Sequence, residues 1–167
     1  SNLTKGWTDI QNEVQPLMQQ TYQFLSSKGL DTESGAIGKQ FATGFKNGIE
    51  SISLKAVTEQ WSGEKLQKVA TDLGTRFSTL GGEGSRFSEI LDEVKEKQEE
   101  FGNYAGDFGA VEKYKEEVRG LSDELRGMAL SMNDGSVAGS ALAESFNYQA
   151  DQIDSYATEM QYSLSSA

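Results

Sequence analysis

Hydrophobic residues recur every three or four positions along almost the whole chain, and polar residues fill the positions between them. In an α-helix this spacing places the hydrophobic side chains on one face. Six such runs cover about residues 3–25, 35–60, 63–80, 85–101, 110–132 and 137–164. The pattern therefore predicts six helices, each with one hydrophobic face.

Short segments rich in glycine, serine and acidic residues separate these runs. They are residues 26–35, 61–63, 81–85, 102–110 and 133–136. Ser34 and Ser62 immediately precede hydrophobic runs, so both are candidate N-caps. Pro16, the only proline, falls inside the first run. Since proline cannot occupy a helix interior without losing a hydrogen bond, we expect a kink or a break there.

Short connections favour antiparallel neighbouring helices, and a hydrophobic period near 3.5 favours the small crossing angles of bundles and coiled coils. We therefore predict an all-α fold, an elongated antiparallel bundle of five or six helices, with residues 1–167 in a single domain. We expect a small hydrophobic core for a chain of this length, since Leu, Ile, Val and Phe make up only 35 of 167 residues. A partner, or a second copy of the chain, would add buried area.

Six glycines lie inside the predicted helices, where each costs about 1 kcal/mol relative to alanine. They are Gly38, Gly44, Gly48, Gly74, Gly120 and Gly127. One interpretation places them where another helix crosses closely. The alternative is that they loosen the helices so that the bundle can open on binding. Gly120 and Gly127 are seven positions apart and share one helix face, where a third helix or a partner could approach.

The net charge of −11 is carried entirely by the second half of the chain. Residues 1–80 are neutral, whereas residues 81–167 contain eighteen acidic and seven basic residues. A nucleic-acid binder needs a basic face, which this chain lacks, and an anionic membrane surface is disfavoured for the same reason. The acidic half is either a solvated surface or a docking face for a basic partner or a cation.

The residue types in the chain mainly exclude classes of catalytic and metal site. The chain contains no histidine and no cysteine, which excludes Ser-His-Asp and Cys-His catalysis, ordinary zinc sites and disulfides. Carboxylates crowd the run at 85–101, but lysines alternate with them, as on a salt-bridged exposed helix face. No stretch approaches the ~18 apolar residues of a transmembrane helix. We therefore expect no enzyme activity, no cofactor, no metal and no membrane span.

Aromatic residues near helix ends and the glycines that share a helix face are the candidate binding residues. Tyr104, Phe108 and Tyr114 cluster around the segment 102–110, and Trp61 precedes Gly63 in another turn. The alternative for the aromatic side chains is packing in the core and at its boundary. The complete set is Trp61, Gly63, Tyr104, Phe108, Tyr114, Gly120 and Gly127.

The segment QWSGEKLQKVATDLGTRF, residues 60–77, resembles the Trp-x-Gly hairpin of the WXG100 family. Trp61 and Gly63 occupy the motif positions, and hydrophobic runs flank them across about residues 37–101. The resemblance implies a small secreted helical protein, exported by a specialised bacterial secretion system and often dimeric. The C-terminal Tyr-x-x-x-acid signal of that family is missing, because Tyr148 and Tyr156 each precede an acidic residue by three positions.

The sequence leads us to expect a non-enzymatic helical interaction protein that binds a macromolecule, in the first place another protein, through a helix face. Abundant Ser, Thr, Gln, Asn and Gly without Cys or His favour a secreted or cell-surface location, with the cytoplasm as the alternative. One alternative function is an amphipathic helical-bundle carrier of a lipid or other apolar ligand, since helix glycines would ease its opening. The other is a secreted WXG-like helical-hairpin factor. A homo-oligomer is compatible with each.

Overall fold

A computed structural model of the chain describes residues 12, 15–16, 19–30, 32–33, 37–82, 84–104 and 106–165. Every regular element in these ranges is a helix, and they contain no strand. The prediction of an all-α bundle is therefore confirmed. No helix in the described ranges is both long and apolar enough to cross a lipid bilayer.

Helices follow one another along nearly all of the described chain. Residues 19–27 are helical, and they are followed by α2 (Ile37–Thr58), α3 (Gly63–Leu80), α4 (Arg86–Glu100), the 3₁₀ helix η1 (Phe101–Tyr104), α5 (Phe108–Met132) and α6 (Val137–Ser165). The helix bounds fall within a few residues of the hydrophobic runs. The segment 102–110, expected to be a loop, is partly helical because η1 extends to Tyr104 and α5 begins at Phe108.

Part of the first predicted helix, 3–25, lies outside the described residues. The kink expected at Pro16 depends on neighbours that are not described, and the proposed cap Ser34 is itself outside the described ranges. Both expectations therefore stay predictions.

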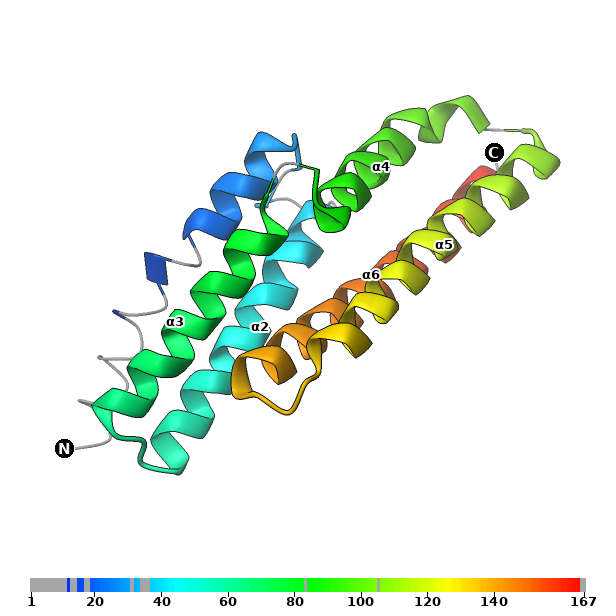
Figure 1. The fold of residues 1–167 in the computed structure, drawn as a ribbon. Coiled ribbons are helices and arrows are strands. Elements are labelled where there is room, and N and C mark those ends of the chain that lie inside the picture. The colour runs from blue at the N-terminus through cyan, green and yellow to red at the C-terminus, as the bar shows by residue number, and fades with distance from the viewer. Residues whose placement is uncertain are drawn as a thin grey trace.

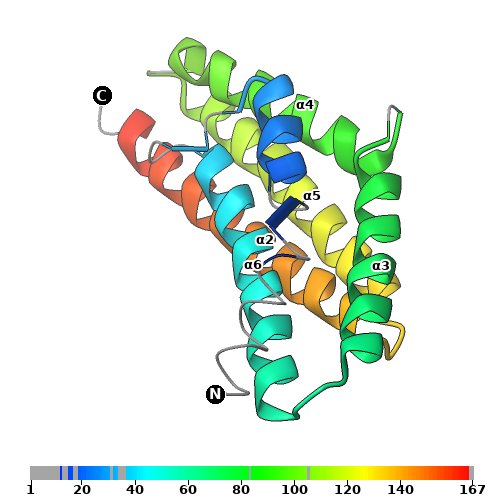
Figure 2. The same ribbon diagram turned by 90° about the vertical axis from the view of Figure 1, so that its left-hand side faces the viewer.

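The bundle is elongated, and its longest unit is the antiparallel hairpin of α5 and α6 (Figure 1). The second most extensive helix pair is α2 with α6, and α3 also contacts α6. Helix α4 packs against α5 (Figure 2) and lies on the same side of the hairpin as α2, since Phe87 of α4 contacts Phe45 of α2. Helix α6 is therefore the element to which most of the other helices are attached.

Side-chain caps define the beginnings of four helices, and Ser85 caps α4 by accepting a hydrogen bond from the backbone N–H of Ser88 at 3.1 Å. Ser62, Asp107 and Ser136 each accept a hydrogen bond from the backbone N–H three residues later, at 3.1, 3.1 and 3.0 Å. Each bond satisfies one of the backbone donors that the first turn of a helix leaves without a partner. The prediction that Ser62 is an N-cap is confirmed.

Phenylalanines from five helical segments form the centre of the core. The ring of Phe87 in α4 lies 5.5 Å from that of Phe146 in α6 and 5.7 Å from that of Phe45 in α2. Phe77 of α3 lies 5.2 Å from Phe45, and Phe24 lies 6.3 Å from Phe87. The Phe24–Phe87 pair is stacked and the other three pairs are tilted or edge-on, and such ring pairs add to the stabilisation from burial alone.

Small residues allow α2 and α6 to cross closely. Gly44 and Gly48 are buried on α2. A Cβ atom added at Gly44 would lie 3.1 Å from the carbonyl oxygen of Ser145 on α6. The interpretation that helix glycines mark a close crossing is therefore confirmed for these two positions.

Candidate binding surfaces

The candidate binding residues from the sequence do not form one site. Trp61 and Gly63 lie at the turn between α2 and α3, whereas Tyr104 and Phe108 lie where η1 leads into α5. These two turns are at opposite ends of the bundle (Figure 1).

Trp61 anchors the end of a helix. Its side chain is half-buried against the core, and the Lys65 ammonium lies 4.9 Å from the centre of its ring. Its buried indole nitrogen has no hydrogen-bond partner among the described residues. Gly63 is exposed, and a Cβ added there would meet nothing within 4 Å. The surroundings of Trp61 thus match the packing alternative.

Tyr104 and Tyr114 are brought together, with ring centres 5.2 Å apart. Tyr114 is only 1% exposed, and its hydroxyl donates to the sulfur of Met160 at 3.2 Å. Burial raises the pKa of Tyr114. Its role as a binding-surface residue is therefore corrected, because Tyr114 belongs to the core. Phe108, by contrast, is 68% exposed.

Gly120 and Gly127 lie on the outer face of α5. Both are exposed, and a Cβ added at either would meet nothing within 4 Å. No third helix from the described ranges crosses there, so close packing within the bundle does not explain these glycines. Leu130, three positions after Gly127, is 81% exposed on the same helix.

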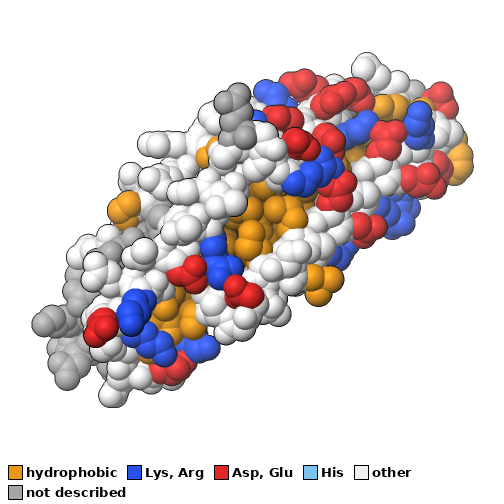
Figure 3. Space-filling view, in the orientation of Figure 1, with side chains coloured by type: hydrophobic (Ala, Val, Ile, Leu, Met, Phe, Trp, Pro, Cys, Tyr) orange, Lys and Arg blue, Asp and Glu red, His pale blue; other side chains and the backbone are white. Residues whose placement is uncertain are grey.

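A hydrophobic surface that the sequence did not single out lies between α3 and α5. Figure 3 shows hydrophobic side chains exposed in the middle of this face, with charged side chains near both ends. The helices that border this face carry half-buried hydrophobic residues, among them Phe77 of α3, Met128 and Met132 of α5, and Val137 of α6. We call these four residues and the area between them the α3–α5 strip.

The strip is exposed because α4 does not cover all of α5. The first residue of α4, Arg86, pairs with Glu124 of α5, and the chain of α4 runs from there toward the beginning of α5. Beyond Glu124, Met128 and Met132 continue the hydrophobic face of α5. Because α3 packs against α6 and α4, it leaves this part of α5 partly open.

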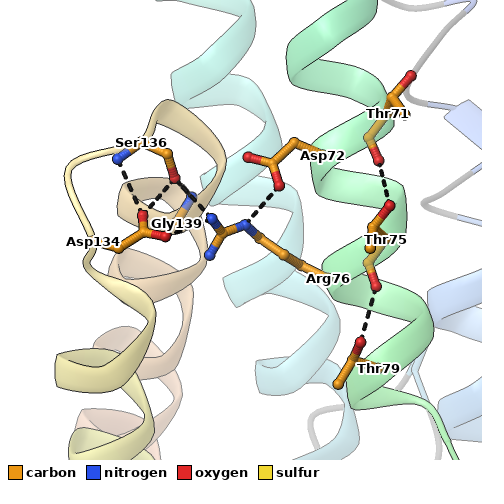
Figure 4. Close-up of polar contacts among 8 residues, drawn as sticks. All are labelled: Thr71, Asp72, Thr75, Arg76, Thr79, Asp134, Ser136 and Gly139. Carbon is orange, nitrogen blue, oxygen red and sulfur yellow. Dashed lines mark hydrogen bonds and ion pairs between the residues drawn. The ribbon is translucent and has the colours of Figure 1, made fainter.

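One end of the strip is closed by ion pairs around Arg76. This side chain binds Asp72 on its own helix at 3.0 Å, and it reaches the α5–α6 loop at Asp134, 2.7 Å away, and Ser136, 3.0 Å away (Figure 4). The hydrogen bond from Arg76, supported by bonds from Ser136, holds the pKa of Asp134 well below its ordinary value. Arg76 thereby ties α3 to the α5–α6 hairpin.

The other end of the strip carries ion pairs around Arg86. This side chain binds Glu89 at 2.9 Å, lies 3.6 Å from Glu93, and also pairs with Glu124. The two arginines at the ends of the strip are thus surrounded by five carboxylates. The border of the strip is therefore acidic overall, in keeping with the charge of the second half of the chain.

A pocket of about 300 Å³ lies between residues 19–27, α2, the end of α3 and the start of α4, and it shares Phe77 with the α3–α5 strip. Its walls include the phenylalanines Phe24, Phe45, Phe77 and Phe87. The sequence placed each of them on a hydrophobic run, but the pocket depends on how four separate helical segments meet.

Within the described ranges, no group of three or more Asp, Glu, His or Cys side chains is arranged to hold a metal ion. Comparison with known proteins gives no match, whether to a family model, a curated protein or a solved structure. The resemblance to the WXG100 hairpin therefore rests on Trp61, Gly63 and their flanking helices.

Proposed function

We propose that this protein is a non-enzymatic interaction protein that binds an amphipathic, basic helix of another protein at the α3–α5 strip. The observation that carries the proposal is the exposed continuation of the hydrophobic face of α5 beyond the point where α4 stops covering it. A bundle gains stability by covering such a face, and a partner helix would cover it in the same way.

The residues of the strip suit a helical ligand. Met128 and Met132 have flexible, polarisable side chains that adapt to different apolar partners. Phe77 offers a large flat apolar surface on the opposite helix. A hydrophobic strip bordered by helices on both sides matches the recognition mode in which an amphipathic helix inserts its apolar face.

The charge at the border favours a basic partner. Five carboxylates and two arginines lie at its ends, so lysine or arginine on the flanks of the partner helix would be attracted. An acidic helix would be repelled by the same groups. Such complementarity mainly raises the association rate and selects the partner, while the apolar contact supplies most of the affinity.

The proposed location is outside the cell or on its surface. The supporting observation is compositional, namely abundant Ser, Thr, Gln, Asn and Gly with no Cys or His. Localisation of the full-length gene product by cell fractionation tests this part separately from binding.

Calorimetric titration with two synthetic amphipathic peptides tests the binding proposal. One peptide has leucine on its apolar face and lysine on its polar face, and the second has glutamate in place of lysine. We expect the lysine peptide to bind the protein, with an affinity that falls as salt is added, and the glutamate peptide to bind at least about tenfold more weakly.

Two single substitutions on α5 provide the matched comparison. Met128→Asp places a charge within the strip, whereas Leu130→Asp places the same charge on the exposed face outside it. We expect about a tenfold or greater loss of lysine-peptide affinity for the first and little change for the second. Met128→Gln serves as a milder variant if circular dichroism shows that Met128→Asp is unfolded. Equal losses for the strip variant and Leu130→Asp would refute the strip as the binding site.

A further inference from the structure

We infer that the pocket walled by Phe24, Phe45, Phe77 and Phe87 binds a small neutral aromatic molecule of about two fused rings. This inference concerns a different ligand from the partner helix proposed for the α3–α5 strip and does not depend on it. It rests on four properties of the pocket: its fixed walls, its volume, its lack of charge and its open mouth.

The walls of the pocket are held in place by the core. Phe45 and Phe77 lie with ring centres 5.2 Å apart, and Phe87 contacts both Phe45 and the buried Phe146. Phe24 lies 6.3 Å from Phe87 with the two rings 29° from parallel. Because these rings already support one another, a ligand would not have to order them, and this lowers the cost of binding.

The volume limits the ligand to a small molecule. The pocket measures about 300 Å³, the lower end of the range for ligand sites. An apolar cavity of about 150 Å³ in another protein accommodates benzene, so twice that volume suits about two fused rings. Long acyl chains and protein helices are too large. The phenylalanine faces and edges favour an aromatic molecule over an aliphatic one of the same size, because paired rings attract each other beyond the gain from burial alone.

The lining also selects against charge. None of the described residues that line the pocket is acidic or basic. A buried ion would lose its hydration without gaining a counter-charge, so a charged ligand is disfavoured. The exposed Gln20 and Ser78 at the rim carry an amide and a hydroxyl, which suit one hydroxyl or amine on an otherwise apolar ligand.

Gly81 lies at the mouth of the pocket, beside Phe24. Gly81 follows α3 with φ −79°, and a Cβ added there would lie 3.9 Å from Cδ2 of Phe24. A side chain larger than alanine at Gly81 would therefore reach the mouth. The backbone at Gly81 is in a conformation that any residue adopts, so its turn does not require glycine.

Titration of 2-naphthol into the full-length protein, followed by calorimetry and by ligand fluorescence, tests the inference. We expect one molecule to bind per chain with a Kd below about 1 mM, and the melting temperature to rise with ligand concentration. The anionic analogue naphthalene-2-sulfonate is expected to bind at least about tenfold more weakly. Absence of 2-naphthol binding at millimolar concentration, or equal binding of the two compounds, would overturn the inference.

Substitutions along α3 locate the bound molecule. Ser78→Trp places a large side chain at the rim and is expected to weaken 2-naphthol binding at least tenfold. The matched control Thr75→Trp adds the same side chain one turn earlier, at an exposed position that does not line the pocket, and is expected to leave binding unchanged. Gly81→Leu provides a second obstruction if Ser78→Trp fails to fold. Equal affinity in the obstructed and control variants would place the ligand elsewhere and refute the inference.

Binding of the lysine peptide separates the two proposals. Gly81→Leu should abolish naphthol binding and leave peptide binding at the α3–α5 strip intact. Met128→Gln should weaken peptide binding and leave naphthol binding intact.

Discussion

A Cβ atom added to Gly48 would lie 2.8 Å from the backbone carbonyl oxygen of Ala141, so α2 and α6 meet backbone against backbone at this point. The carbonyl belongs to a helix and cannot rotate away as a long side chain would. A glycine here therefore lets two helices approach more closely than any side chain would permit. The same residue type on α5, at Gly120 and Gly127, faces open space.

Because α2 and α6 cross so closely, even one added methyl group at the crossing is expected to destabilise the protein. Gly48→Ala should lower the free energy of unfolding by about 1–3 kcal/mol, because the new methyl group forces the two helices apart. Urea unfolding followed by circular dichroism measures the change. A variant as stable as the wild type would show that the helices can separate at this crossing without loss.

On the outer face of α5, replacing glycine with alanine is expected to change the free energy of unfolding in the opposite direction. Gly120→Ala and Gly127→Ala should each raise the free energy of unfolding by about 1 kcal/mol, because alanine favours a helix and nothing obstructs its methyl group. The same urea experiment serves as the measurement. Destabilisation by either change would mean that these positions need glycine for a contact beyond the described part of the chain.

The turn between α2 and α3 contains a strained residue. Gln60 has φ 53°, in the left-handed region that residues with a Cβ atom adopt at a cost of about 1–2 kcal/mol. Gln60→Gly should therefore stabilise the protein by about 1 kcal/mol, whereas Gln60→Ala, which keeps a Cβ atom, should have little effect. Thermal unfolding of the two variants in parallel distinguishes relief of strain from loss of a glutamine contact.

The ion pair of Arg76 with Asp134 predicts a pH-dependent attachment of α3. The pKa of Asp134 is lowered in the folded protein, mainly by the hydrogen bond from Arg76, so folding favours its charged form. Its contribution to stability is complete above the ordinary aspartate pKa of about 4 and disappears as the pH falls through the lower folded pKa. Hydrogen exchange of the α3 amides should therefore become faster relative to α5 as the pH is lowered from about 5 toward 2.

The control for this prediction is Asp134→Asn, which removes the charge at every pH. In this variant the α3 amides should already exchange faster at pH 5, and the additional acid-induced change should be smaller than in the wild type. An identical pH dependence in the two proteins would assign the effect to other carboxylates.

The helices could be predicted from the sequence because their determinants are local. The spacing of residues such as Phe41, Phe45 and Ile49 fixes a helix face whatever that face contacts. A capping serine such as Ser62 needs only its own helix. The relation between helices is not local, and the pattern therefore did not show that Gly48 lies at a crossing while Gly127 is exposed.

The candidate sites could not be predicted from the sequence, because they too depend on how separate helices pack. The α3–α5 strip exists because α4 begins at Arg86 opposite Glu124 and leaves Met128 partly uncovered, a relationship between three separate helices. The phenylalanine pocket likewise joins residues as distant as Phe24 and Phe87. Conversely, its place near a loop makes Tyr114 a candidate binding residue in the sequence, but in the structure its side chain is buried in the core.

The amide of Gln149 donates to the backbone carbonyl of Phe41, 108 positions earlier in the chain. Because ribosomes make proteins from the N-terminus, α2 emerges long before the partner that shelters it has been translated. The glycine face of α2 around Gly44 therefore has no packing partner until α6, the last helix, has been synthesised. A nascent polypeptide halted before residue 141 would lack the face of α6 against which α2 packs.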